Sequence, residues 1–188
     1  MTARRYDYLR DPKAIYRQTF EAVRRETDLS GIPDDLHPLA LRIAHACGDP
    51  GIVANLAWSD GAAAAGRAAL AAGASILCDT RMVETGIIHV HLPESNRLVC
   101  TLTDPRVPDL ARTLDTTRSA AAVELWQDML AGAVVAIGNA PTALFHLLEG
   151  LAAGWPRPAS DAREPDILES PLASLRPKGW PRAGRSRP

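Results

Sequence analysis

The sequence lacks any apolar run long enough to span a bilayer, and its first residues lack the apolar stretch of a signal peptide. It also lacks a CxxC pair and has only three cysteines, Cys47, Cys78 and Cys100, which lie far apart. A disulfide framework is therefore excluded, and three reduced thiols are predicted. Together these absences predict a cytoplasmic protein without a membrane partner.

The sequence also lacks an excess of either charge, because acidic and basic residues are interspersed and the formal net charge is −1. No overall field favours a nucleic acid or an acidic membrane. An anionic ligand would have to be met by a local site. The length of 188 residues suits one domain, or one domain followed by a tail.

Apolar runs and helical spacing alternate along the chain, which predicts an α/β protein with a mainly parallel sheet. The same patterns, with Pro and Gly at the ends, predict helices over 12–26, 38–48, 61–72 and 117–130 and a helix opening at Pro141, and strands over 75–79, 98–102 and 133–137. After Trp155 the periodicity stops and Pro, Arg and Ser dominate. Residues 156–188 are therefore predicted to be mostly disordered.

His45 is expected in the last turn of its helix, three residues before Gly48. The partial negative charge at a helix C-terminus favours imidazolium, so a proton would be available near neutral pH. Spacing alone nevertheless favours a structural histidine over a catalytic one.

Two pairs of residues invite a metal-site interpretation. His45 and Cys47 are two apart on a helix and point to different sides, so a shared metal is rejected there. His89 and His91 lie in a segment expected to be extended, where they would face the same side and form half of a site. No third ligand is apparent, and a solvated strand face is the preferred explanation.

Two predicted helix starts have groups that can hold a carboxylate. Residues 115–119 combine hydroxyl caps with the guanidinium of Arg118, although without other evidence ordinary capping is the preferred explanation. The turn at Gly138 and Asn139 lies beyond the carboxyl end of a strand, the usual binding edge of an open α/β sheet. It is not a GxGxxG motif, so nucleotide binding ranks far below the other possibilities.

Several stretches together resemble the precorrin-8X methylmutase family, in the family's order and over roughly residues 6–158. The matching stretches are Tyr6–Asp11, Ile15–Phe20, Ile43–Gly48, Ala65–Leu70, Ile76–Val83, Asp104–Pro108, Thr117–Ala121 and Ile137–Leu144. The resemblance implies a three-layer α/β/α domain that acts as a homodimer. It also implies an isomerase of cobalamin biosynthesis that moves a methyl group of precorrin-8X from C-11 to C-12, giving hydrogenobyrinate without a redox or methyl-donating cofactor.

The resemblance also assigns site residues. His45 matches the family's active-site histidine, which is proposed to exchange a proton with the macrocycle, and this reverses the preference for a structural role. Thr19 stands where the family usually has a substrate-contacting serine, and Arg118 looks like the family's pocket arginine. Thr117 and Asn139 are expected beside the substrate carboxylates. The resemblance does not distinguish a metal-free from a cobalt-containing substrate.

The C-terminus departs from the family after Ala159, where relatives continue into an apolar strand, a glycine-rich loop and a final helix. The methylmutase-like domain is therefore expected to span 1–158, with a divergent tail over 159–188. A frameshift or a natural truncation would produce this pattern, and resequencing the gene would test the first. The alternative function is a remnant that binds corrin intermediates without turnover.

Overall fold

The computed structural model describes residues 6–159, and within this range the chain forms two compact units that divide between Ser59 and Asp60. The predicted tail over 159–188 lies outside the described residues except for Ala159. The backbone N–H of Ala159 donates to the carbonyl of Ala133, at 2.7 Å, and Arg157 accepts from Gly132, at 3.0 Å. Arg157 and Ala159 are therefore hydrogen-bonded to the domain, and the disorder predicted for 160–188 lies outside the described residues.

The first unit is helical, and its boundaries follow from local caps. It contains α1 (Pro12–Glu26), η1 (Asp34–Leu36), α2 (His37–Cys47) and η2 (Pro50–Asn55). The carboxylate of Asp11 accepts from the backbone N–H of Lys13 and starts α1. Gly48, with φ of +65°, ends α2 in the left-handed conformation that glycine adopts without strain. Both predicted helices are confirmed.

The first unit has a small core, formed by Ala40, Ala44 and Val53 with partly buried neighbours. Helix α1 contributes no buried residue to it. On the apolar stripe of α1, Ile15 is 43% exposed and Tyr16 is 51% exposed. This stripe is therefore an apolar surface of the first unit.

The second unit contains a three-stranded parallel sheet in the order β2-β1-β3. Leu77 is in register with Val99 on one side and with Val135 on the other. Its elements are α3 (Ala62–Ala71), β1 (Ile76–Cys78), α4 (Arg81–Gly86), η3 (His89–His91), β2 (Leu98–Val99), α5 (Val107–Thr113), α6 (Arg118–Glu124), η4 (Gln127–Met129), β3 (Val134–Ala136) and α7 (Pro141–Ala152).

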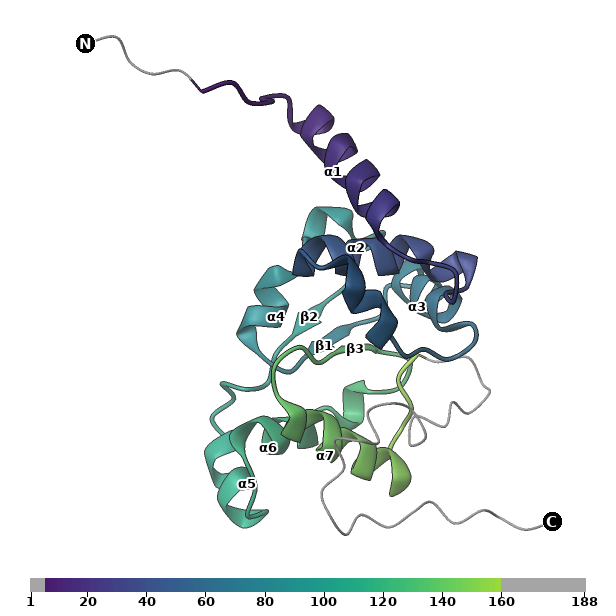
Figure 1. The fold of residues 1–188 in the computed structure, drawn as a ribbon. Helices are drawn as coiled ribbons and strands as arrows, with labels where there is room; N and C mark the ends of the chain where they lie inside the picture. Colours follow the sequence, from purple (N-terminus) through teal and green to yellow (C-terminus); the bar gives the residue numbers. More distant parts are fainter. Residues whose placement is uncertain (1–5, 160–188) are drawn as a thin grey trace, which may run out of the picture. The chain divides into compact units, whose positions relative to one another are not determined.

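Helices cover both faces of this sheet, α3 and α4 on one side and α6 and α7 on the other (Figure 1). The main core lies between the sheet and the second pair, where Leu77, Trp126 and Leu147 pack together. The predicted three-layer α/β architecture with a parallel sheet is confirmed. No helix among residues 6–159 combines the length and the apolar character needed to cross a membrane.

The strand predicted over 98–102 is too long, and the helix predicted over 117–130 is interrupted. Strand β2 ends at Val99 because the Thr101 hydroxyl turns toward α6, donating to the carbonyl of Ala122 at 2.8 Å and accepting from the Trp126 indole at 2.9 Å. Trp126 is fully buried. Helix α6 ends at Glu124 and gives way to tighter turns, in which Trp126 donates to Val123.

Candidate active site

A buried carboxylate lies at the carboxyl edge of the sheet. Asp79 directly follows β1 and is 2% exposed. It accepts three backbone hydrogen bonds from the turn between β3 and α7: from Gly138 at 3.2 Å, from Asn139 at 3.0 Å and from Ala140 at 2.8 Å. An anion in this place is stabilised by the converging N–H groups and by the positive end of the α7 dipole.

The backbone of the turn predicted as an anion-binding helix start already has an acceptor within the protein. The three N–H groups are engaged by Asp79, a residue that sequence reasoning included in the preceding strand without assigning it a role. The sequence does contain a signal for this role. An aspartate that ends a buried apolar strand requires hydrogen-bond donors if its carboxylate is buried too. The side chain of Asn139 is not involved in these bonds, and the residue is exposed.

The starts of α6 and α7 lie against each other. Thr117 caps α6, its hydroxyl oxygen accepting from the backbone N–H of Ala120 at 3.2 Å. The same hydroxyl donates to the hydroxyl of Thr142, in the first turn of α7, at 2.8 Å. The two predicted anion-binding helix starts therefore form one surface, and the structure adds Thr142 to it.

Arg118 is the first residue of α6 and is exposed. Its guanidinium makes no hydrogen bond or ion pair with any residue between 6 and 159. A guanidinium with no internal partner is suited to pair with a ligand carboxylate. Three predicted residues, Thr117, Arg118 and Asn139, thus lie at these two adjacent helix starts. We call these three residues and Thr142 the carboxyl-edge cluster.

The other two predicted residues, His45 and Thr19, lie on the first unit. His45 is exposed in the last turn of α2, as expected. Its ring stacks on Phe20 of α1, with ring centroids 4.8 Å apart and an interplanar angle of 29°. Phe20 in turn contacts the Tyr16 ring, at 4.5 Å. The aromatic contact therefore orients the imidazole and leaves it accessible.

Thr19 precedes Phe20 on α1. Its hydroxyl donates to the carbonyl of Ile15, one turn earlier, at 2.8 Å. In this conformation the hydroxyl oxygen still has lone pairs that can accept a hydrogen bond, whereas donating to a ligand requires the hydroxyl to rotate.

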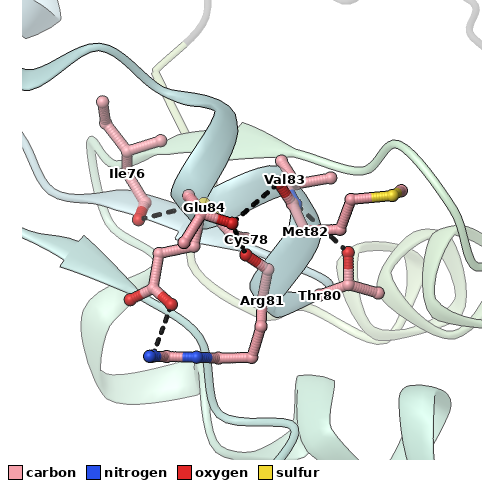
Figure 2. Close-up of polar contacts among 8 residues, drawn as sticks. Ile76, Cys78, Thr80, Arg81, Met82, Val83 and Glu84 are labelled. Atoms are coloured by element: carbon pink, nitrogen blue, oxygen red, sulfur yellow. Dashed lines mark hydrogen bonds and ion pairs between the residues drawn. The ribbon is translucent and has the colours of Figure 1, made fainter.

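The last residue of β1, Cys78, holds a buried thiol, and the segment after it begins α4 (Figure 2). The Thr80 hydroxyl caps α4 by accepting from Val83, at 3.4 Å, and Arg81 pairs with Glu84, at 2.5 Å. Burial raises the pKa of the Cys78 thiol to about 11, and the charge of Glu84 contributes to the rise. A thiol with this pKa is almost entirely protonated at neutral pH, so Cys78 is not suited to nucleophilic catalysis.

The state of Cys78 predicts a selective labelling pattern. At pH 8 iodoacetamide should modify the exposed Cys47 and leave Cys78 unmodified until the protein is unfolded in urea, because the buried thiol is both shielded and protonated. Mass spectrometry of peptides from native and unfolded samples measures this. Equal labelling of the two residues in the native protein would contradict the described burial.

His89 and His91 do not share a face. They lie in the short 3-10 helix η3 and not in an extended segment, and with three residues per turn their side chains point in different directions. The extended segment expected here is therefore wrong, and with it the shared face on which half of a metal site was considered. Within residues 6–159, no group of three or more His, Cys, Asp or Glu side chains could hold a metal ion.

Comparison with known proteins identifies one family. The family model for precorrin-8X methylmutase matches residues 14–160. The chain is 59% identical over 153 residues to the precorrin-8X methylmutase of Pseudomonas aeruginosa, a match that covers 81% of this chain and 74% of that protein. It is 51% identical over 155 residues to that of a Sinorhizobium species, covering 82% and 74%.

More distant relatives and a solved structure agree. The cobalt-precorrin-8 methylmutase of Methanothermobacter thermautotrophicus is 33% identical over 137 residues, covering 72% of this chain and 63% of that protein. The crystal structure of precorrin-8X methylmutase from Thermus thermophilus superposes with a TM-score of 0.69 at 34% identity, covering 87% of this chain and 81% of that one. The chain therefore belongs to the precorrin-8X methylmutase family, a family of isomerases.

Proposed function

We propose that this protein catalyses the intramolecular methyl shift from C-11 to C-12 of precorrin-8X, giving hydrogenobyrinate in cobalamin biosynthesis. The observation that carries the proposal is the 59% identity to the Pseudomonas methylmutase over a stretch of 153 residues. The family match over 14–160 includes all five candidate residues. Two relatives named for precorrin-8X are 59% and 51% identical, whereas three named for cobalt-precorrin-8 are 26%, 33% and 30% identical, which favours the metal-free substrate.

His45 is proposed as the proton-transfer residue. The methyl group leaves one carbon and joins its neighbour within a single molecule, so no second substrate is required and one proton exchange with the ring suffices. The exposed imidazole, oriented by its stack on Phe20, can present a ring nitrogen to the macrocycle.

The carboxyl-edge cluster is proposed to hold the acetate and propionate carboxylates of the macrocycle. Arg118 supplies a guanidinium without an internal partner, and Asn139 supplies an exposed amide. Thr117 and Thr142 supply hydroxyls at adjacent helix starts. Thr19 is proposed as a further substrate contact, through its hydroxyl. Aimed donors of this kind suit a protein whose net charge is only −1.

The protein is proposed to act as a cytoplasmic homodimer whose methylmutase domain spans 1–158. The exposed apolar stripe of α1, with Ile15 and Tyr16, supports a partner surface on the first unit. Sedimentation at micromolar concentration would measure the state. A monomer there would contradict the dimer, and the isomerase proposal would remain open to its own assay.

Incubation of the purified chain with precorrin-8X tests the function. We expect the absorbance of hydrogenobyrinate to develop, and a separate titration with hydrogenobyrinate to show binding. Binding without conversion would instead support the alternative, a protein that holds corrin intermediates without isomerising them. If the chain neither binds hydrogenobyrinate nor converts precorrin-8X, both the isomerase and the binding-only proposal are contradicted.

A further inference from the structure

The buried carboxylate of Asp79 links the carboxyl ends of two neighbouring strands, β1 and β3. Asp79 directly follows β1, and its three hydrogen-bond donors lie 59 to 61 residues later in the chain, beyond the carboxyl end of β3. β1 and β3 are neighbouring parallel strands. After β1 the chain turns into α4 on one face of the sheet, and after β3 it turns into α7 on the other (Figure 1). Such a divergence is where open α/β sheets bind ligands.

The turn after β3 is held from two sides. Both carboxylate oxygens of Asp79 are used, Oδ1 by Gly138 and Oδ2 by Asn139 and Ala140. Helix α4 packs against the same turn, because a Cβ added to Gly138 would lie only 2.8 Å from Cγ2 of Val83. Asp79 and Val83 therefore fix the backbone from which the Asn139 side chain extends.

The carboxylate also changes what the turn can bind. Three converging N–H groups at a helix start would attract any anion, including a carboxylate of the substrate. Asp79 already satisfies them with a charge that belongs to the protein and is 2% exposed. A second carboxylate would meet repulsion and no free donor there. Substrate carboxylates are thereby directed to the side chains of Asn139, Thr142 and Arg118.

We propose that Asp79 is a positioning residue for substrate binding, which fills the amide nest of residues 138–140 and holds Asn139 and the start of α7 toward the substrate carboxylates. This inference rests on the proposed function. Asp79 acts through Asn139 and its neighbours and does not touch the macrocycle itself. It adds to the site a residue that is almost completely buried.

Asp79→Asn is the first test, because the amide keeps the size of the carboxylate but places an NH2 group against backbone donors. We expect KM for precorrin-8X to rise about tenfold, with kcat within about threefold of the parent, since the proton-transfer residue is unaltered. The Kd for hydrogenobyrinate should rise in parallel. Asp109→Asn, on the exposed side of α5, makes the same substitution as a control and should leave both constants unchanged.

A double-mutant cycle with Asn139→Ala separates positioning from a general loss of stability. If Asp79 acts through Asn139, the KM of the double variant should be lower than the product of the two separate effects predicts. Fully multiplicative effects would overturn the proposal. So would an unchanged KM in Asn139→Ala alone, a result that does not depend on whether Asp79→Asn folds.

The outcomes for Asp79 and for the proposed function are distinguishable. Turnover by the parent with an unchanged KM in Asp79→Asn would overturn the role of Asp79 and leave the isomerase intact. Binding of hydrogenobyrinate without turnover in the parent would overturn the isomerase, while the variant's Kd would still decide the role of Asp79. A parent that neither turns over precorrin-8X nor binds the product would overturn both.

Discussion

Replacing His45 by alanine is expected to reduce kcat for the methyl shift by about 100- to 10,000-fold, the usual contribution of a positioned general acid or base. The imidazole is the group proposed to exchange a proton with the ring, and its exposed place at the end of α2 gives the macrocycle access to it. Binding of hydrogenobyrinate should change only a few-fold, because the donors proposed for the carboxylates lie elsewhere in the chain. Stopped-flow absorbance gives kcat, and equilibrium titration gives Kd.

His91→Ala is the matched control for this variant. His91 is an exposed histidine in η3 with no assigned part in the chemistry, and its loss should leave kcat unchanged. A His45→Ala protein that retains more than about a tenth of the parental kcat would remove His45 from the proton transfer. The remaining acceleration would then have to come from substrate orientation alone.

Gly150→Ala is expected to destabilise the protein by about 1–3 kcal/mol, the range found for overpacked cores. A Cβ at this position in α7 would lie 2.4 Å from ring atoms of Trp155, and an indole cannot bend away as a flexible chain end does. The ring is also held by its own backbone, because the Trp155 N–H donates to the carbonyl of Gly150 at 3.0 Å. Chemical unfolding followed by Trp fluorescence measures the change.

Gly66→Ala, in the middle of α3, is the control for that substitution. An added Cβ there meets nothing within 4 Å, so the only effect is the better helix propensity of alanine. This variant should be stabilised by about 0.5–1 kcal/mol. Destabilisation of both variants to the same extent would show that the contact with Trp155 does not determine the cost at Gly150.

Elements whose ends are encoded locally were predicted well. Helix α1 opens at Pro12 and α2 closes at Gly48, each through the residue type that its backbone position demands. The central strands are continuous apolar runs, which the interior of a parallel sheet favours. Helices α4 and α5, of six and seven residues, are too short to show two full turns of periodicity, so the sequence pattern does not predict them.

Features that depend on distant partners were not predicted. Thr101 leaves the strand because of hydrogen bonds to Ala122 of α6 and to Trp126 just beyond it, more than twenty residues away. Asp79 finds its donors about sixty residues later, so no local pattern identifies it as the residue that fills the turn after β3. Conversely, Thr117 and Asn139 were expected at separate helix starts, and only the folded chain brings those starts together through the Thr117–Thr142 hydrogen bond.

The most direct test of the central claim follows the migrating methyl group itself, because substrate and product of an isomerase have the same mass. Precorrin-8X with a 13C-labelled methyl group at C-11 would be incubated with the purified chain and examined by 13C NMR. The account predicts that the labelled resonance moves to that of a methyl group at C-12 without exchange with solvent or loss of label. A resonance that stays at C-11, with the protein folded and saturated with substrate, would contradict it.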